Sequence, residues 1–177
     1  MNGENRVTEM IYTLVKMMRI SLSNENYLVP LEEELGHVRQ YVKLVEFRFH
    51  GRVSLHQEIP ESMGSERIVK LTLQPLIENA IQHGLAHVRS GGNIWLRGEK
   101  KGQDNYLYVI DNGQGMNEEE LEKLTKQLRV STVIGSRHIG MCNVDQRLKL
   151  VFGEEYGLSL SHSEEGGLCI TIHFKTI

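Results

Sequence analysis

The chain has 177 residues, 40% of them hydrophobic and 24% charged, and its 20 basic and 23 acidic side chains give a net charge of −3. This length suits one globular domain, or one domain with an extension, that buries a hydrophobic core. The basic residues are scattered, which predicts no nucleic-acid-binding surface. No apolar run approaches the roughly 20 residues of a membrane span and no signal peptide is present, so we expect no membrane contact by this chain. Cys142 and Cys169 lack metal-ligand spacing and are expected to be free thiols.

Two helices are predicted in the first 50 residues. Residues 6–22 carry apolar side chains at helical spacing, which indicates either a core helix or one side of a dimer interface. Residues 24–30 are expected to connect this helix to a second one, from residue 31 to about residue 49. The apolar side of the second helix would be formed by Leu35, Val38, Val42 and Val45, with His37 on its surface.

Five segments have the alternation or the composition of β-strands. They are residues 53–59, ended by Pro60, and residues 92–98, 106–111, 158–162 and 168–174. Such strands, with three helices on one face, predict an α+β fold built as a two-layer α/β sandwich.

Residues 73–84 have the pattern of an amphipathic helix. Asn79 and His83 would lie one turn apart on the polar side, while Glu78 points about 100° away. An Asn carbonyl is a hard oxygen ligand that suits Mg²⁺ held together with phosphates, and a His can donate to a phosphate. A solvated polar stripe is the alternative interpretation.

The predicted strand 106–111 ends in Asp111, which enters the turn Asn112-Gly113-Gln114-Gly115-Met116. A carboxylate at the end of a rigid strand can accept a hydrogen bond from an exocyclic amine, and Gly113 and Gly115 allow positive φ and close backbone approach. An ordinary Asp-Asn-Gly turn remains open. A calcium loop is excluded because its third and fifth positions would be glycines and its sixth would be Met116.

A further helix is predicted from the spacing of Val144, Leu148, Val151 and Phe152, with Gly153 as its C-terminal cap. Gly140 would lie just before this helix. Backbone N–H groups and the helix dipole favour an anion there, and glycine has no side chain to block a phosphate.

Taken together and in this order, the three segments resemble the nucleotide-binding boxes of the GHKL ATPase superfamily, which contains gyrase, Hsp90, MutL and the histidine kinases. Residues 73–84 look like the N box of the YesM/LytS-type sensor histidine kinases, residues 111–116 like the G1 box and residues 138–144 like the G2 box. Residues 30–49 are similar to the helix before the catalytic domain of that subfamily. The resemblance implies a Bergerat-type ATP-binding domain over residues 51–177, preceded over residues 1–50 by the remainder of the dimerisation region.

The resemblance also implies roles for individual residues: Asp111 would bind the adenine amine of ATP, and Asn79 would coordinate Mg²⁺ at the triphosphate. The implied cofactor-binding set is Asn79, His83, Asp111, Gly113, Gly115, Met116, Gly140 and Met141. The stretch from Met116 to about Gly140, with Lys123, Lys126 and Arg129, would be a lid over the phosphates, mobile at 130–136 without nucleotide.

Two positions depart from the family pattern. His138 replaces the usual first glycine of the G2 box, and Leu168 replaces a threonine near the adenine. Both changes predict modest nucleotide affinity.

The activity implied by the resemblance is that of a protein-histidine kinase. The γ-phosphate of ATP would pass to a histidine on the dimerisation helix and then to a response-regulator aspartate. None of the eight histidines has the subfamily's Asn-Pro-His-Phe context. The chain is therefore expected to be the cytoplasmic part of a longer, homodimeric and membrane-anchored bacterial receptor.

Three alternatives stay open at this point. An ATP-hydrolysing clamp is disfavoured because Pro75 stands where such enzymes carry the water-activating glutamate. A serine kinase acting on an anti-anti-sigma protein is disfavoured by the helix at 31–49. A dimerisation or scaffold module with a decayed nucleotide site is the third possibility.

Overall fold

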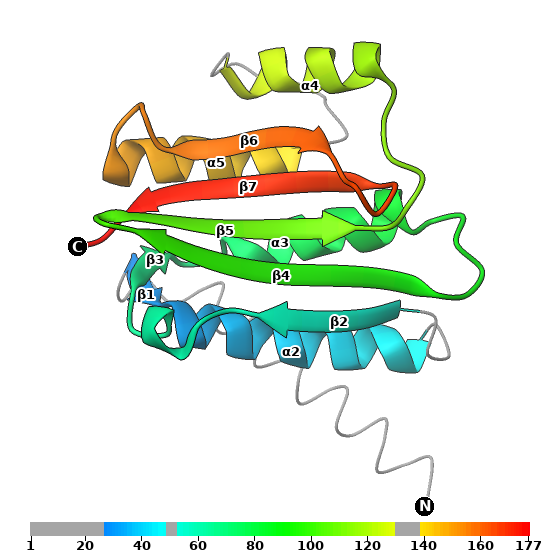
Figure 1. Ribbon diagram of the computed structural model, residues 1–177, viewed down its shortest axis with the longest axis horizontal. Helices are drawn as coiled ribbons and strands as arrows, with labels where there is room; N and C mark the ends of the chain where they lie inside the picture. The colour runs from blue at the N-terminus through cyan, green and yellow to red at the C-terminus, as the bar shows by residue number, and fades with distance from the viewer. Residues whose placement is uncertain (1–26, 49–52, 130–138) are drawn as a thin grey trace, which may run out of the picture.

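The computed structural model describes residues 27–48, 53–129 and 139–177. Its centre is a five-stranded sheet of order β2-β4-β5-β7-β6, in which β2 runs parallel to β4 and the other neighbouring pairs are antiparallel (Figure 1). The strands are β2 (Val53–Glu58), β4 (Gly92–Lys101), β5 (Asp104–Asp111), β6 (Gly157–His162) and β7 (Leu168–Lys175).

Helices cover one face of this sheet, behind it in the view of Figure 1. They are α2 (Leu31–Arg48), α3 (Leu73–Asn79) with its π-helical continuation η2 (Ala80–Gly84), and α5 (Ile139–Phe152). A fourth helix, α4 (Glu118–Arg129), lies beyond β6 at the edge of the sheet, and the short 3₁₀ helix η1 (Glu61–Met63) follows β2. This is the predicted two-layer α/β sandwich, so the expected fold class is confirmed.

The core forms where the apolar sides of strands and helices meet. Alternate residues of β4, β5 and β7, such as Leu96, Leu107 and Ile172, are fully buried. The predicted apolar side of α2 is confirmed, because Leu35, Val38, Val42 and Val45 are all buried against this core. Each such side chain contributes about 1.5–3 kcal/mol through its burial.

A small second sheet was not predicted. The strands β1 (Leu28–Pro30) and β3 (Arg67–Val69) pair antiparallel, with Leu28 opposite Val69. The sequence predicted a connection at residues 24–30. For residues 28–30, which form β1, this prediction is wrong. Three-residue strands are too short to show a period, and their pairing depends on partners far apart in the chain.

His37 also differs from its prediction, because the structure buries it. The side chain belongs to α2, but the residue is 9% exposed and its Nδ1 lies 4.0 Å from Oε1 of Glu34. The surface position expected from the sequence is therefore wrong. The periodicity of α2 places His37 between Glu34 and Val38, next to the core side of the helix.

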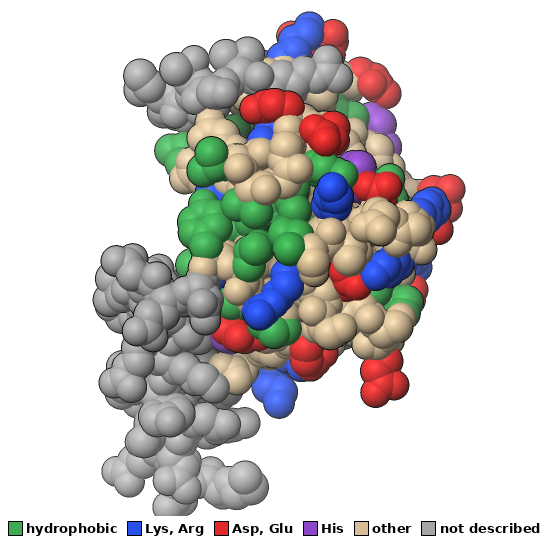
Figure 2. Space-filling model, turned by 90° about the vertical axis from the view of Figure 1, so that its left-hand side faces the viewer, with side chains coloured by type: hydrophobic (Ala, Val, Ile, Leu, Met, Phe, Trp, Pro, Cys, Tyr) green, Lys and Arg blue, Asp and Glu red, His purple; other side chains and the backbone are tan. Residues whose placement is uncertain are grey.

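Some expectations lie outside the described residues, namely the helix at 6–22, the stretch 130–136 and His138. Within the described ranges, none of the helices combines the length and apolarity needed to cross a bilayer. Figure 2 shows one end of the sandwich, where hydrophobic side chains gather near the centre and basic and acidic side chains alternate around them.

Candidate functional site

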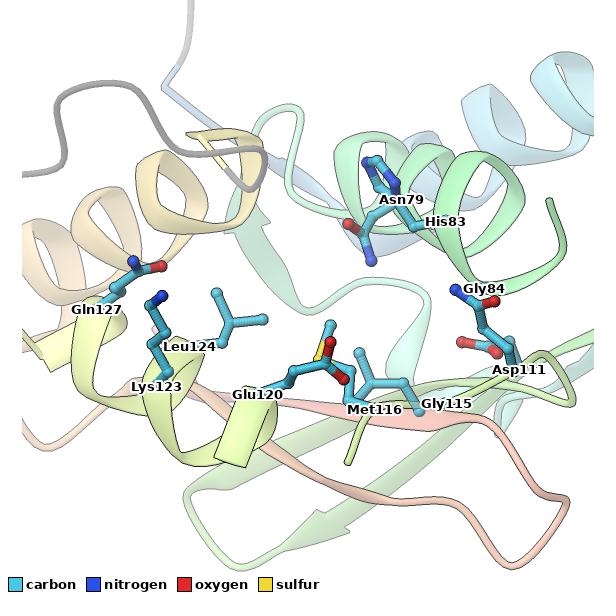
Figure 3. A pocket seen from close by; sticks show the side chains of 12 residues that line it. Asn79, His83, Gly84, Asp111, Gly115, Met116, Glu120, Lys123, Leu124 and Gln127 are labelled. Atoms are coloured by element: carbon cyan, nitrogen blue, oxygen red, sulfur yellow. The ribbon is translucent and has the colours of Figure 1, made fainter. Parts of the chain in front are cut away.

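A cavity of about 350 Å³ opens between α3 and η2 on one side and α4 on the other (Figure 3). Asp111 lies at one end of it, and Lys123 and Gln127 of α4 lie at the other. The lining consists of Asn79, His83, Gly84, Asp111, Gln114, Gly115, Met116, Glu120, Lys123, Leu124, Gln127 and Leu168.

Asp111 is the last residue of β5 and is only 3% exposed. The backbone N–H of Gly113 donates to its Oδ1 at 2.8 Å, and the backbone of Leu168 also hydrogen-bonds the carboxylate. Burial raises the pKa of Asp111 above its ordinary value of 3.8, and the two backbone hydrogen bonds oppose this shift. A carboxylate has about four lone-pair positions, so it retains the capacity to accept hydrogen bonds from a ligand in the cavity.

Three glycines pack against this carboxylate. A Cβ on Gly84 would lie 2.7 Å from Oδ1 of Asp111, a Cβ on Gly167 would lie 2.2 Å from the same atom, and a Cβ on Gly113 would lie 2.1 Å from the carbonyl oxygen of Gly84. No larger residue fits at these positions without displacing the backbone or Asp111. Gly115 has the positive φ (63°) that its prediction allowed, whereas Gly113 serves through close approach alone.

Asn79 and His83 both line the cavity from the helical wall, as their spacing predicted (Figure 3). Glu78 is not part of the lining, and its Oε1 accepts a hydrogen bond from Nε2 of Gln74 at 2.9 Å. The side chain of Asn79 therefore lines the cavity, whereas the carboxylate of Glu78 does not. The chemistry on this wall is an amide and an imidazole.

The helix that carries these residues is not the regular α-helix that was predicted. From Ala80 it continues as a π-helical turn, in which the N–H of Leu85 donates to the carbonyl of Ala80 at 2.8 Å. Single π-turns of this kind occur often at functional sites. Here Gly84, at the end of the π-turn, lies against the carboxylate of Asp111. The helical periodicity of the sequence did not predict this contact.

The opposite wall is α4, whose residues Glu120, Lys123, Leu124 and Gln127 face the cavity. Its first turn is a capping box: the N–H of Glu120 donates to Oδ1 of Asn117 at 2.9 Å, and the N–H of Asn117 donates to Oε2 of Glu120 at 3.0 Å. This stretch was expected to be part of a lid, and no helix was predicted there. The spacing Asn117-Glu118-Glu119-Glu120 was the signal that could have revealed it, and with it the lining by Leu124 and Gln127.

Gly140 and Met141 are not brought into the cavity. Since α5 begins at Ile139, Gly140 lies within its first turn rather than before it, and it borders a separate hollow beside Pro75. Met141 is buried in the core. The expected position of Gly140 just before the helix is therefore wrong, because helix ends are uncertain by one or two residues in such predictions.

Both cysteines are free, as predicted. Cys142 is buried near the start of α5, and burial raises the pKa of its thiol. It does not line the cavity.

Comparison with known proteins agrees with this geometry. A family model described as "Histidine kinase-, DNA gyrase B-, and HSP90-like ATPase" matches residues 64–176, and a histidine kinase model matches residues 1–53. The chain therefore belongs to the histidine kinase-, DNA gyrase B- and HSP90-like ATPase family. The resemblance noted in the sequence is confirmed.

Within this family, the chain is similar to the catalytic part of sensor histidine kinases. It is 33% identical over 171 residues to the sensor histidine kinase YesM of Bacillus subtilis (strain 168), covering 97% of this chain and 28% of YesM. It is 31% identical over 160 residues to the sensor protein kinase HptS of Staphylococcus aureus (strain USA300), covering 90% of this chain and 30% of HptS. The chain thus spans less than a third of the length of these curated relatives.

Solved structures show the same fold at lower identity. The catalytic domain of the histidine kinase ThkA superposes with a TM-score of 0.65 at 16% identity, over 84% of this chain and 95% of that one. The ATP binding domain of PrrB from Mycobacterium tuberculosis superposes with a TM-score of 0.59 at 18% identity, over 85% and 96% of the two chains.

Proposed function

We propose that residues 51–177 are the ATP-binding catalytic domain of a sensor histidine kinase and that residues 1–50 are the remainder of its dimerisation region. The observation that carries this proposal is the buried carboxylate of Asp111 at the end of the cavity, enclosed by glycines and fixed by backbone N–H groups. Domains of this family bind ATP. A desolvated acceptor at the end of a strand suits the exocyclic amine of adenine.

In the proposed complex, Asp111 accepts a hydrogen bond from the adenine amine, and Gly113, Gly115 and Met116 surround the base. The cavity continues from Asp111 towards α4, where the triphosphate would lie (Figure 3). Asn79 would supply an amide oxygen to Mg²⁺, a hard ligand for a hard ion. When bound, Mg²⁺ neutralises negative charge on the phosphate oxygens.

The remaining members of the proposed set act on the phosphates. The ring of His83, one turn beyond Asn79, would donate to a phosphate oxygen from the same wall of the cavity. Gly140 and Met141 lie outside the described lining of the cavity. Their proposed contribution is limited to backbone N–H groups in the first turn of α5, for phosphates that extend beyond that lining.

The reaction we propose for the whole protein is phosphoryl transfer. The bond between the γ-phosphorus and the bridging oxygen breaks, a phosphorus–nitrogen bond forms at a histidine of the dimerisation region, and ADP leaves. The phosphoryl group then passes to an aspartate of a response regulator. Most of the rate enhancement in such reactions comes from positioning and charge neutralisation.

The parent protein is further proposed to be a homodimer at a membrane, with this domain in the cytoplasm. Two facts support this: ATP is a cytoplasmic substrate, and the curated relatives are named as sensors, with matched segments that make up only 28% and 30% of their length.

ATP hydrolysis is less well supported by the walls of the cavity. Pro75, one helical turn before Asn79, lies at the other hollow, and the carboxylate of Glu78 is outside the lining. Glu120 does line the cavity, but its Oε2 accepts the N–H of Asn117 in the capping box. The carboxylates of the described lining are therefore Asp111, at the proposed adenine end, and Glu120, on the wall opposite Asn79.

Calorimetric titration tests the proposal. Mg-ADP and a non-hydrolysable ATP analogue are titrated into the wild-type chain, Asp111→Asn and Asn79→Ala, with Gln82→Ala on the exposed side of η2 as the matched control. We expect micromolar to sub-millimolar affinity that is lost in Asp111→Asn and becomes independent of Mg²⁺ in Asn79→Ala. Absence of heat at millimolar nucleotide would instead support the scaffold alternative.

A further inference from the structure

Two of the buried carboxylates in the described part of the chain, Glu34 and Asp145, lie outside the cavity, and Glu34 contacts the start of α3. Glu34, in the first turns of α2, is 1% exposed and accepts three backbone hydrogen bonds from the segment that begins α3. The N–H of Leu71 donates to Oε1 at 2.7 Å, and the N–H groups of Thr72 and Leu73 donate to Oε2 at 2.9 and 3.0 Å. The first N–H groups of a helix have no acceptor within their own helix. Here the acceptor is Glu34, a residue of another helix.

The turn at residues 70–72, which precedes α3, also binds a cationic side chain through its carbonyl groups. Arg147 of α5 donates from Nη1 to the carbonyl of Lys70 at 2.8 Å and from Nη2 to the carbonyl of Leu71 at 2.7 Å. Leu71 has a φ of 59°, a conformation that a leucine adopts only when its surroundings enforce it. The turn at residues 70–72 is thus fixed between an anion that binds its N–H groups and a cation that binds its carbonyls.

This turn determines where α3 begins, and Asn79 lies at the other end of that seven-residue helix. Asp111 belongs to β5 and is fixed by the backbone of Gly113 and Leu168, and Gly84 of η2 also packs against its carboxylate. The two halves of the nucleotide site therefore differ in their main support. The sheet supports the adenine end, and the contacts with α2 and α5 support the metal end.

We propose that Glu34 is a positioning residue for the metal–phosphate half of the site: it fixes the start of α3 against α2 and thereby sets the position of Asn79 relative to Asp111. The proposal rests on the function proposed above. It also makes α2 a route by which the region before the catalytic domain influences binding of a Mg²⁺–nucleoside triphosphate, chiefly through the metal end of the site.

The test is the substitution Glu34→Gln, which removes the charge and sets an amide NH₂ against one of the three N–H donors. The matched control is Glu33→Gln, the same change at the next residue, which is exposed. A non-hydrolysable ATP analogue is titrated into each chain with Mg²⁺ and again with EDTA, after thermal denaturation has verified a cooperative fold.

We expect Glu34→Gln to weaken binding about tenfold when Mg²⁺ is present and to leave binding in EDTA within about twofold of wild type. Glu33→Gln should match wild type under both conditions. An equal loss with and without Mg²⁺ would overturn the proposal, because it would indicate general loosening of the fold. The proposal would also be overturned if Glu34→Gln and Glu33→Gln bound the analogue equally well in Mg²⁺ while wild type bound normally.

If Glu34→Gln does not fold, Arg147→Lys tests the same turn from the other side. Lysine keeps the charge but cannot donate to both carbonyls in the geometry of a guanidinium. The same Mg²⁺-dependent loss is expected, and unchanged Mg²⁺-dependent binding would overturn the role of the turn. Failure of the wild-type chain to bind nucleotide under either condition would refute the proposed function itself, a distinct result.

Discussion

At the scale of single residues, the carboxylate of Asp111 is suited to binding at a cost in stability. Its burial favours the neutral acid, which is why its pKa is raised, and at neutral pH the folded protein must hold the anion out of water. We expect Asp111→Asn to raise the melting temperature of the nucleotide-free chain at neutral pH, since the amide oxygen can still accept from Gly113. The same variant should lose nucleotide binding.

The pH dependence gives this prediction a sign. Because the folded pKa lies above the unfolded value of 3.8, folding takes up a proton between the two values, and wild type loses stability as the pH rises through the folded pKa. The advantage of Asp111→Asn should therefore be largest at neutral pH and shrink as the pH approaches 3.8. Thermal denaturation of both proteins across this range measures it. An advantage that grows towards acid pH would contradict the burial argument.

The glycines around Asp111 give a second prediction. A Cβ on Gly167 would lie 2.2 Å from Oδ1 and 2.3 Å from the carbonyl oxygen of Asp111, so Gly167→Ala must displace the carboxylate or the backbone. We expect a destabilisation of about 1–3 kcal/mol in chemical denaturation, together with loss of nucleotide binding.

A matched substitution is available in α2. Gly36 is helical, and a Cβ there would meet only the end of Arg39 at 3.8 Å. Gly36→Ala should therefore stabilise the chain by about 0.5–1 kcal/mol and leave binding unchanged. If both alanine variants had the same effect, steric exclusion at Gly167 would not be the cause.

At the scale of elements, the sequence predicted those whose burial is periodic over many residues. The stripe on α2, the alternation in β4 and β5, and the cap at Gly153 (φ 117°) are all present in the structure. Elements that depend on distant partners were not predicted. The pairing of β1 with β3 and the π-turn η2 require contacts that no local pattern encodes.

The candidate site divides in the same way. Asn79, His83 and Asp111 could be placed because their elements were predicted with the correct phase. The contribution of Gly84 and Gly167 could not, because close packing around a carboxylate becomes visible only when β5, β7 and η2 come together. Gly140 was misplaced by the uncertainty of one or two residues that affects every helix end.

The junction of α5, α4 and β6 gives a prediction for elements. The carboxylate of Asp145 is 1% exposed; it accepts a hydrogen bond from the N–H of Leu158 at 2.7 Å and pairs with Lys149 at 2.5 Å. Lys149 also donates to the carbonyl of Leu128, near the end of α4. Lys149→Met should destabilise the chain by about 2 kcal/mol, because it leaves a buried anion without its cation.

Its control is the exposed pair of Lys126 and Glu122 within α4, in which both side chains are 69% exposed. Lys126→Met should change the free energy of unfolding by less than about 0.5 kcal/mol. Urea denaturation of the two variants provides the comparison. Similar values for both would show that burial of Asp145 does not govern the strength of this junction.

At the scale of the whole molecule, the proposed function separates nucleotide binding, in the described domain, from a phosphoryl acceptor that we propose lies in another part of the protein. The proposed adenine end of the cavity is formed by the sheet, the proposed metal end by α3, and the opposite wall by α4 (Figure 3). None of the eight histidines of the sequence has the acceptor context of the subfamily, and His37, on α2, is buried beside Glu34. A site that binds ATP without an acceptor within reach should retain the γ-phosphate.

We therefore expect the purified 177-residue chain to bind Mg-ATP without phosphorylating itself. Incubation with ATP labelled at the γ-phosphate, followed by gel analysis under alkaline conditions that preserve phosphohistidine, measures the outcome. Wild type should incorporate no more label than Asp111→Asn, while a saturating nucleotide concentration about a hundredfold above Kd stabilises wild type alone, by about 2.7 kcal/mol. Label present on wild type and absent from Asp111→Asn would show that an acceptor lies within this chain. The phosphorylated residue would then identify the element that reaches the γ-phosphate.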